Sequence, residues 1–156
     1  MTEIERKFLV IVAPPDLTSF PSSEIRQGYL AVDPDGTEVR VRSRDEAFVL
    51  TAKQGAGRSR TEVELDLDRD TFDRLWPLTE GRQVQKRRYV MPAGAGITIE
   101  VDVYSGALTG LVVAEVEFGD DDRADAFDPP SWFGPEVTDD PRFKNQSLAR
   151  EDMPAT

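Results

Sequence analysis

The chain begins with the stretch that decides the expected fold, Glu3-Ile4-Glu5-Arg6-Lys7-Phe8-Leu9-Val10. Side chains of an extended strand alternate between the two faces of a sheet, so Glu3, Glu5 and Lys7 share one face. Two carboxylates at this spacing lie about 7 Å apart and repel each other, which favours a cation between them. The lysine adds a positive charge suited to an anion beside that cation. This strand therefore predicts a charged face around which the remaining chain closes a barrel.

The composition limits the kinds of site that the chain can build. Its 156 residues include 19 Lys and Arg against 30 Asp and Glu, for a formal net charge of −11. Such an acidic chain is unfavourable for nucleic-acid binding, although a few clustered cations can still hold a small polyanion. The sequence has no Cys and no His, which excludes disulfides and both thiolate and imidazole ligands. Any metal site must use oxygen ligands, as Mg²⁺, Mn²⁺ and Ca²⁺ prefer.

The length predicts a single domain over residues 1–156, with room for a sizeable core. We find no signal-peptide segment and no apolar run long enough to span a membrane. A cytoplasmic protein without membrane or nucleic-acid partners is therefore expected. Apolar strand faces that the few helices leave uncovered could form the contact of a homodimer.

Alternating patterns predict strands along most of the chain, whereas helical patterns are few. Asp68 or Asp70 is expected to cap one helix, which Pro77 limits. Two further short helices are expected over residues 123–127 and 146–150. Little helix and many strands predict a mainly β (α+β) fold, an eight-stranded antiparallel closed β-barrel with a few short helices outside. The predicted strands cover residues 3–10, 24–32, 37–43, 47–53, 60–67, 84–91, 97–104 and 112–118.

Charges of the same sign recur two residues apart in many of these strands. A solvated strand face is the ordinary explanation of any one pair, but such a face usually mixes both signs with Thr, Ser and Gln. Divalent cations would relieve the repulsion of the acidic pairs, and a polyphosphate that of the basic pairs. An eight-stranded barrel has room for one small ligand of this kind. The pairs are Glu3/Glu5, Arg40/Arg42, Glu62/Glu64, Lys86/Arg88, Glu100/Asp102 and Glu115/Glu117.

The same positions resemble the CYTH domain, the family of triphosphate tunnel metalloenzymes. Its ExExK signature matches Glu3, Glu5 and Lys7, and further matching positions follow in order over nearly the whole chain. The resemblance implies an antiparallel tunnel that binds a triphosphate with basic residues and a divalent metal with glutamates. The further positions are Gln27-Gly28-Tyr29-Leu30, Arg40-x-Arg42, Lys53, Arg60-x-Glu62-x-Glu64, Lys86-x-Arg88, Glu100-x-Asp102, Gly110-Leu111, Ala114-Glu115-x-Glu117, Trp132-Phe133-Gly134-x-Glu136-Val137-Thr138 and Lys144-Asn145-x-x-Leu148-Ala149.

The resemblance also implies a role for each charged position. The implied metal ligands are Glu3, Glu5, Glu62, Glu64, Asp102, Glu115 and Glu117, with Glu100 completing the acidic wall. The implied phosphate-binding residues are Lys7, Arg40, Arg42, Lys53, Lys86, Arg88 and Lys144. The implied catalytic set is Glu3, Glu5, Lys7, Arg40, Arg42, Lys53, Glu62, Glu64, Lys86 and Arg88. Arg60 remains open between a tunnel cation and a residue at the mouth paired with an acid.

Within this family, the short chain resembles the small bacterial members that hydrolyse inorganic tripolyphosphate to pyrophosphate and phosphate. The resemblance implies Mg²⁺ or Mn²⁺ as cofactor and Ca²⁺ as an inhibitor. Phosphoryl transfer needs positioning and charge neutralisation more than a covalent nucleophile. Without His, a carboxylate near the metal is the candidate proton acceptor besides the phosphate itself.

Other functions stay open at this point. One alternative is a class IV adenylyl cyclase or a nucleoside or thiamine triphosphatase, and another is a non-catalytic polyphosphate or nucleotide binding protein. No aromatic cluster is evidently dedicated to holding a base, because Trp132 and Phe133 are expected to pack against a helix.

Overall fold

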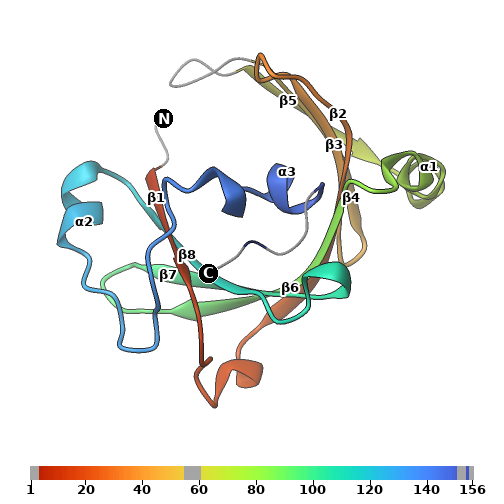
Figure 1. Cartoon of the computed structure of the whole chain (residues 1–156). Coiled ribbons are helices and arrows are strands. Elements are labelled where there is room, and N and C mark those ends of the chain that lie inside the picture. Colours follow the sequence, from red (N-terminus) through yellow and green to blue (C-terminus); the bar gives the residue numbers. More distant parts are fainter. Residues whose placement is uncertain (1–3, 55–60, 151–153, 155–156) are drawn as a thin grey trace. The chain divides into compact units, whose positions relative to one another are not determined.

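The computed structural model describes residues 4–54, 61–150 and 154. These residues hold an eight-stranded sheet in the hydrogen-bonded order β1-β8-β7-β6-β2-β3-β4-β5, and Figure 1 labels each strand. The eight-stranded antiparallel fold predicted from the sequence is confirmed. The strands are β1 (Ile4–Leu9), β2 (Ser22–Val32), β3 (Glu38–Arg44), β4 (Ala47–Gln54), β5 (Thr61–Leu67), β6 (Gln83–Pro92), β7 (Thr98–Tyr104) and β8 (Val112–Phe118).

The strand order has two ends, at β1 and β5. Within the described residues the hydrogen-bonded sheet is therefore open, where the sequence predicts a closed barrel. One reason is visible at β1, whose second edge is taken by another part of the chain. Phe8 forms an isolated antiparallel bridge with Glu136 there.

Short helices connect the strands, close to where the sequence predicts them. Asp68 is the cap of α1, since its carboxylate accepts a hydrogen bond of 2.7 Å from the Thr71 amide. α1 ends at Leu75, before Pro77 as the sequence predicts, and Pro77 lies in the first turn of the following 3-10 helix, where its missing N–H is not needed. Asp120 caps α2, which begins two residues earlier than predicted. The helices are α1 (Arg69–Leu75), α2 (Asp121–Ala126) and α3 (Asn145–Leu148), with 3-10 helices η1 (Leu17–Ser19), η2 (Trp76–Thr79), η3 (Gly106–Leu108) and η4 (Pro141–Phe143).

The chain groups into two compact units. The first unit contains Met1–Ser23 and Arg87–Pro141, and the second contains Glu24–Lys86 and Arg142–Thr156. The single domain expected over the whole length stays a prediction. No helix in the described part of the chain has the length and apolar character needed to cross a membrane.

In the first unit, the core lies on the apolar face of β1, β7 and β8. Val101, Ala114 and Val116 are completely buried there, and α2 lies beside β1 (Figure 1). The ring of Phe133 lies 4.8 Å from that of Phe8 and 6.0 Å from that of Phe127, which follows α2. Phe133 therefore packs against β1 and the residue that follows α2, where the sequence predicts packing against a helix.

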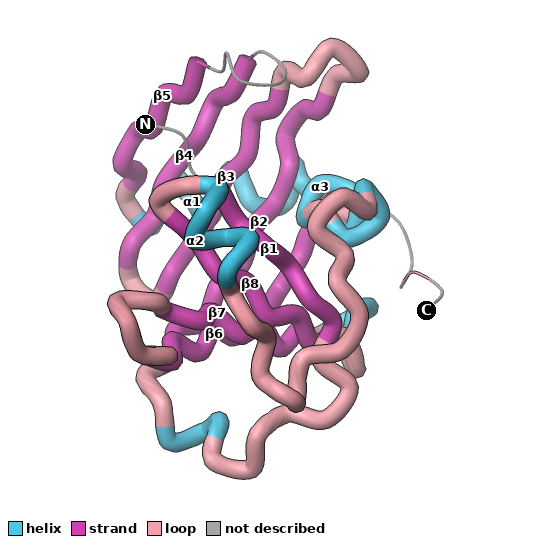
Figure 2. Tube along the Cα trace, turned by 90° about the vertical axis from the view of Figure 1, so that its left-hand side faces the viewer, coloured by secondary structure: helices cyan, strands magenta, loops and turns pink. Residues whose placement is uncertain are grey.

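In the second unit, α1 and η2 cover the apolar face of β3 and β4. Phe72 of α1 lies between Phe48 and Trp76, with ring centroids 5.1 Å and 5.5 Å away. Figure 2 shows β3, β4 and β5 as neighbouring strands. Because side chains alternate along each strand, the face opposite α1 is left for the charged residues.

Candidate functional site

The first unit gathers acidic side chains on the face of β1, β8 and β7 that points away from its core. Glu5 pairs in register with Glu117, and Lys7 with Glu115. Glu115 pairs in turn with Glu100 of β7. Residues directly opposite in neighbouring strands lie on the same face, about 5 Å apart at Cβ. We call this set the acidic group: Glu5, Glu100, Asp102, Glu115 and Glu117.

Glu5 has a strongly perturbed carboxyl group. A hydrogen bond with Glu115, burial, and the negative charge of Glu115 raise the pKa of Glu5 from 4.5 to about 8, while Lys7 lowers it. Because Glu5 is an exposed residue by accessible area, we attribute the change first to Glu115 and only second to burial. The close approach of the two carboxyl groups therefore favours the protonated form of Glu5, and a cation bound between them would favour the ionised form.

Arg88 of β6 lies within the same acidic group. Its Nε and Nη2 donate to the two carboxylate oxygens of Asp102 at 2.8 Å and 2.9 Å. Its Nη1 lies 3.1 Å from Glu100, and its Nη2 lies 3.8 Å from Glu115. Burial lowers the pKa of Arg88, but the carboxylates of Asp102, Glu100 and Glu115 raise it by a larger amount. The net change in the pKa is therefore upward. Arg88 therefore neutralises part of the acidic group in this structure.

The second unit carries basic residues on the charged face of β3 and β4, in β6 and directly before α3. Arg40 pairs in register with Thr51 of β4, and Lys53 pairs with Glu38 on one side and Glu62 on the other. Lys86 of β6 is completely buried, and its Nζ lies 3.5 Å from the side-chain oxygen of Asn145, which begins α3. We call this set the basic group: Arg40, Arg42, Lys53, Lys86 and Lys144.

Arg42 is oriented by two buried neighbours from β2. Its Nε donates to the Gln27 side-chain oxygen at 2.7 Å, and the Gln27 amide donates to the Tyr29 hydroxyl at 2.7 Å. Gln27 and Tyr29 are both buried, so this chain of hydrogen bonds fixes the direction of the guanidinium. Burial is the largest cause that raises the pKa of Tyr29 to about 12, which keeps its hydroxyl protonated.

The Arg40 guanidinium is only partly satisfied by hydrogen bonds. Its Nη1 forms an ion pair of 3.1 Å with Glu38. Its Nε is buried and has no hydrogen-bond partner among the described residues. A buried N–H without an acceptor is costly, and a phosphate oxygen would supply one. This unsatisfied donor is independent evidence that the charged face of the second unit suits an oxyanion.

The CYTH domain model matches residues 1–128 of the chain. The chain belongs to the CYTH domain family. An inorganic triphosphatase of Nitrosomonas europaea is 47% identical to it over 150 residues, covering 96% of this chain and 97% of that relative. An inorganic triphosphatase of Acetivibrio thermocellus is 38% identical over 151 residues, covering 95% and 93%. The crystal structure of the inorganic triphosphatase NE1496 superposes with a TM-score of 0.82 at 42% identity, over 99% and 98% of the two chains.

In this CYTH domain, the predicted site residues fall into different local settings. Glu62 and Glu64 are exposed on β5, where Glu64 pairs with Thr51 and Glu62 lies 3.9 Å from Lys53. Lys144 is exposed at the residue before α3. Glu3 and Arg60 lie outside the described residues, so the metal-binding role of Glu3 and the position of Arg60 stay predictions.

The oxygen-only donor set fits a hard divalent cation. The carboxyl groups of Glu5 and Glu115 lie within hydrogen-bond distance of each other, so a cation between them would relieve their repulsion. Asp102 differs from these two residues, because both its oxygens already accept from Arg88. Among the described residues, no three carboxylates converge closely enough to complete a cation site by themselves.

Sequence reasoning gave no role to several residues that shape this CYTH site. Gln27 and Tyr29 orient Arg42, and Glu38 pairs with Arg40. The alternation of Gln27 and Tyr29 along one strand was the available signal, because it places both on a single face. The pairing of β2 with β3 decides which charged residue they contact. That pairing cannot be read from the sequence.

Proposed function

We propose that this chain hydrolyses inorganic triphosphate to pyrophosphate and phosphate with a divalent metal ion. The close pair of carboxyl groups on Glu5 and Glu115, with Lys7 directly opposite Glu115, is the observation that carries the proposal, since it places oxygen ligands for a cation next to a positive charge suited to phosphate. The two relatives at 47% and 38% identity, which match almost end to end and are inorganic triphosphatases, support the choice of substrate.

Glu5 and Glu115, with Glu117 beside them, would hold the metal, and Glu3, Glu62, Glu64 and Asp102 remain predicted ligands. When bound, the ion would neutralise phosphate oxygens and lower the pKa of a coordinated water. We propose Mg²⁺ or Mn²⁺ as the active ion, because the acidic group offers oxygen ligands alone. Ca²⁺ takes the same ligands, and we expect it to occupy the site without supporting turnover.

The basic residues bind and orient the phosphates in this proposal. Arg42 is directed by Gln27, and Arg40 offers a buried Nε that lacks an acceptor. A forked guanidinium suits two phosphate oxygens at once. A water attacks the terminal phosphorus, the bond to the bridging oxygen breaks, and pyrophosphate leaves. A carboxylate of the acidic group accepts the proton of that water.

The test is a substrate panel with the purified protein. Tripolyphosphate, ATP and thiamine triphosphate are each incubated with Mg²⁺, Mn²⁺ or Ca²⁺, and phosphate, pyrophosphate and cyclic AMP are measured. We expect tripolyphosphate to be hydrolysed fastest with Mg²⁺ or Mn²⁺ and little turnover with Ca²⁺. Faster turnover of ATP or thiamine triphosphate would assign one of the other enzymatic functions. Tight tripolyphosphate binding without any turnover would assign a binding protein.

The remaining expectations about partners stay predictions. The net charge of −11 supports the absence of a nucleic-acid partner. A cytoplasmic location and a homodimer also stay predictions. Sedimentation of the purified protein would decide the oligomeric state.

A further inference from the structure

The strand that carries Glu5 and Lys7, β1, forms backbone hydrogen bonds along both of its edges. One edge of β1 pairs with β8. The other edge pairs with residues 134–138, which we call the strap. Val137 N donates to Lys7 O at 2.8 Å, and Leu9 N donates to Pro135 O at 2.9 Å. The strap therefore supplies a second set of backbone hydrogen bonds to the end strand of the sheet.

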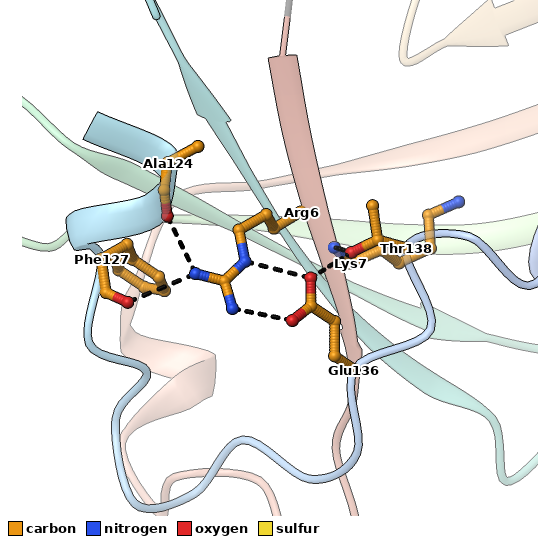
Figure 3. Close-up of polar contacts among 6 residues, drawn as sticks. All are labelled: Arg6, Lys7, Ala124, Phe127, Glu136 and Thr138. Atoms are coloured by element: carbon orange, nitrogen blue, oxygen red, sulfur yellow. Dashed lines mark hydrogen bonds and ion pairs between the residues drawn. The ribbon is translucent and has the colours of Figure 1, made fainter. Parts of the chain in front are cut away.

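Arg6 links this strap to α2 from the opposite face of β1. Its Nε and Nη2 donate to the two carboxylate oxygens of Glu136 at 3.0 Å and 2.7 Å. Its Nη1 donates to the backbone oxygens of Ala124 and Phe127 at 2.9 Å and 3.3 Å. Figure 3 shows the guanidinium lying between the end of α2 and the Glu136 carboxylate. All three guanidinium nitrogens are thus engaged, so the side chain has one well-defined position.

Thr138 carries the connection back to the backbone of β1. Its hydroxyl accepts a hydrogen bond of 3.0 Å from the Lys7 amide and donates one of 2.5 Å to Glu136. Figure 3 shows this continuous path from Arg6 through Glu136 and Thr138 to Lys7. A hydroxyl has one donor and two acceptor positions, so a single Thr serves both contacts without conflict.

This network contributes little to stability, and its main effect is to fix the orientation of the side chains that it joins. The side chains of Arg6 and Glu136 are 22% and 38% exposed, and exposed ion pairs typically contribute only about 0–1 kcal/mol to stability. A bidentate Arg–carboxylate pair nevertheless fixes direction more strictly than a single contact does. Arg6 lies between Glu5 and Lys7 in the sequence, so fixing Arg6 and the Lys7 amide fixes the strand segment that directs both charged side chains.

We propose that Arg6, Glu136 and Thr138 are positioning residues of the triphosphatase reaction, an inference that rests on the proposed function. They hold the β1 backbone in the position from which the Glu5 carboxylate can bind the metal and the Lys7 ammonium can bind the phosphate. None of the three touches the substrate. Their effect reaches the reaction through the backbone of Lys7 and through the strap.

The sharpest test compares two substitutions of Thr138. Thr138→Val removes the hydroxyl and keeps the shape, whereas Thr138→Ser keeps the hydroxyl. We expect Thr138→Val to lower kcat for tripolyphosphate about tenfold, since displacements of a fraction of an ångström are costly in positioned reactions. The Mg²⁺ concentration for half-maximal activity should rise as well, because Glu5 is a proposed ligand. Thr138→Ser should keep the wild-type values.

Two further variants complete the comparison. Arg6→Lys keeps the charge but loses the fork, and it should repeat the loss seen with Thr138→Val. Leu17→Ala serves as the matched control, because Leu17 is buried in the core of the first unit and takes no part in the hydrogen bonds between β1, the strap and α2 described above. It should lower the melting temperature while kcat and the Mg²⁺ requirement stay unchanged below that temperature. Equal kcat values for Thr138→Val, Arg6→Lys and Leu17→Ala would overturn the positioning role.

Hydrogen exchange separates a failure of this inference from a failure of the proposed function. Thr138→Val should speed exchange of the Lys7 and Val137 amides, while Thr138→Ser should not. A wild-type protein that fails to hydrolyse tripolyphosphate removes the proposed function. An active wild type whose Thr138→Val variant keeps both its kcat and slow exchange at Lys7 overturns the inference alone.

Discussion

At the scale of single residues, Glu5 is a proposed metal ligand whose carboxyl group has a strongly raised pKa. Its pKa is about 8 in the folded chain against an ordinary value of 4.5. Between these two values the folded protein keeps a proton that the unfolded chain has released. The free energy of unfolding therefore falls as pH rises through this window.

Glu5→Gln should abolish turnover and also remove this dependence on pH. In EDTA, we expect the melting temperature of wild type to fall relative to that of Glu5→Gln between about pH 5 and about pH 9. Saturating Mg²⁺ should reduce the difference at the higher pH, because the cation replaces the proton of Glu5. Calorimetry at both pH values measures the change.

Glu80→Gln is the control for that experiment, because Glu80 is exposed and lies outside the proposed site. It should keep the wild-type dependence on pH and wild-type activity. An active Glu5→Gln at saturating Mg²⁺ would contradict the assignment of β1 to metal binding.

The two arginines of β3 should differ in their effects on stability. Arg42→Ala leaves the oxygen of the fully buried Gln27 without its donor, at a cost of about 1–3 kcal/mol. Arg40→Ala removes an unsatisfied buried Nε together with one ion pair, so its loss should be smaller. Both variants should weaken tripolyphosphate binding. Urea unfolding and calorimetric titration with Ca²⁺ present measure the two effects.

Equal stability losses in the two variants would contradict the role of Gln27. Like-charge repulsion between Arg40 and Arg42, considered alone, would make either replacement neutral or stabilising. The hydrogen bond to Gln27 reverses the expectation for Arg42 because a buried acceptor is costly to leave unpaired.

At the scale of secondary-structure elements, Gly28 determines how closely η2 packs on β2. A Cβ at this position would overlap the Thr79 hydroxyl and lie 2.6 Å from the Thr79 Cβ. Thr79 is completely buried and its hydroxyl donates to Trp76 O at 2.6 Å. The contact therefore cannot be relieved by moving a flexible side-chain end.

Gly28→Ala should destabilise the protein by about 1–3 kcal/mol through overpacking. Gly119→Ala is the matched control, since a Cβ there meets nothing within 4 Å. Urea denaturation measures the free energy of unfolding of both. A Gly28→Ala variant as stable as Gly119→Ala would show that η2 can withdraw from β2 without cost.

At the scale of the whole molecule, the acidic group belongs to the first unit and most basic residues to the second. Each group carries internal repulsion in the absence of ligand. Ligands that bind only the folded chain stabilise it by RT ln(1 + [L]/Kd), about 2.7 kcal/mol at a hundredfold excess over Kd. For a chain of 156 residues this corresponds to a rise in melting temperature of roughly 5–10 °C.

Tripolyphosphate with Ca²⁺ should therefore raise the melting temperature more than either component alone. Each component relieves repulsion of one sign only, and Ca²⁺ is chosen because we expect it to prevent turnover. Scanning calorimetry measures the shifts. Equal shifts with and without Ca²⁺ would leave the acidic group without a ligand, and no shift under any condition would return both groups to ordinary solvated faces.

Much of this protein follows from the order of its residues. Alternation places Glu5 and Lys7 on one face of a strand because the side-chain period of a strand is two. Asp68 begins a helix because its carboxylate satisfies an amide that the helix leaves unpaired. The absence of His and Cys restricts any metal site to oxygen ligands. These properties depend on neighbours along the chain, and the sequence contains them directly.

Other properties depend on which strands become neighbours, and the tertiary structure decided these. The carboxyl groups of Glu5 and Glu115 meet because β1 pairs with β8, although the two residues lie far apart in sequence. Arg88 binds Asp102 through both carboxylate oxygens, whereas the sequence pattern placed the two residues on separate strands and the family resemblance implied separate roles for them. The charge pattern determines which side chains share a face, whereas strand register determines which charges meet, and Coulomb energy depends on that distance.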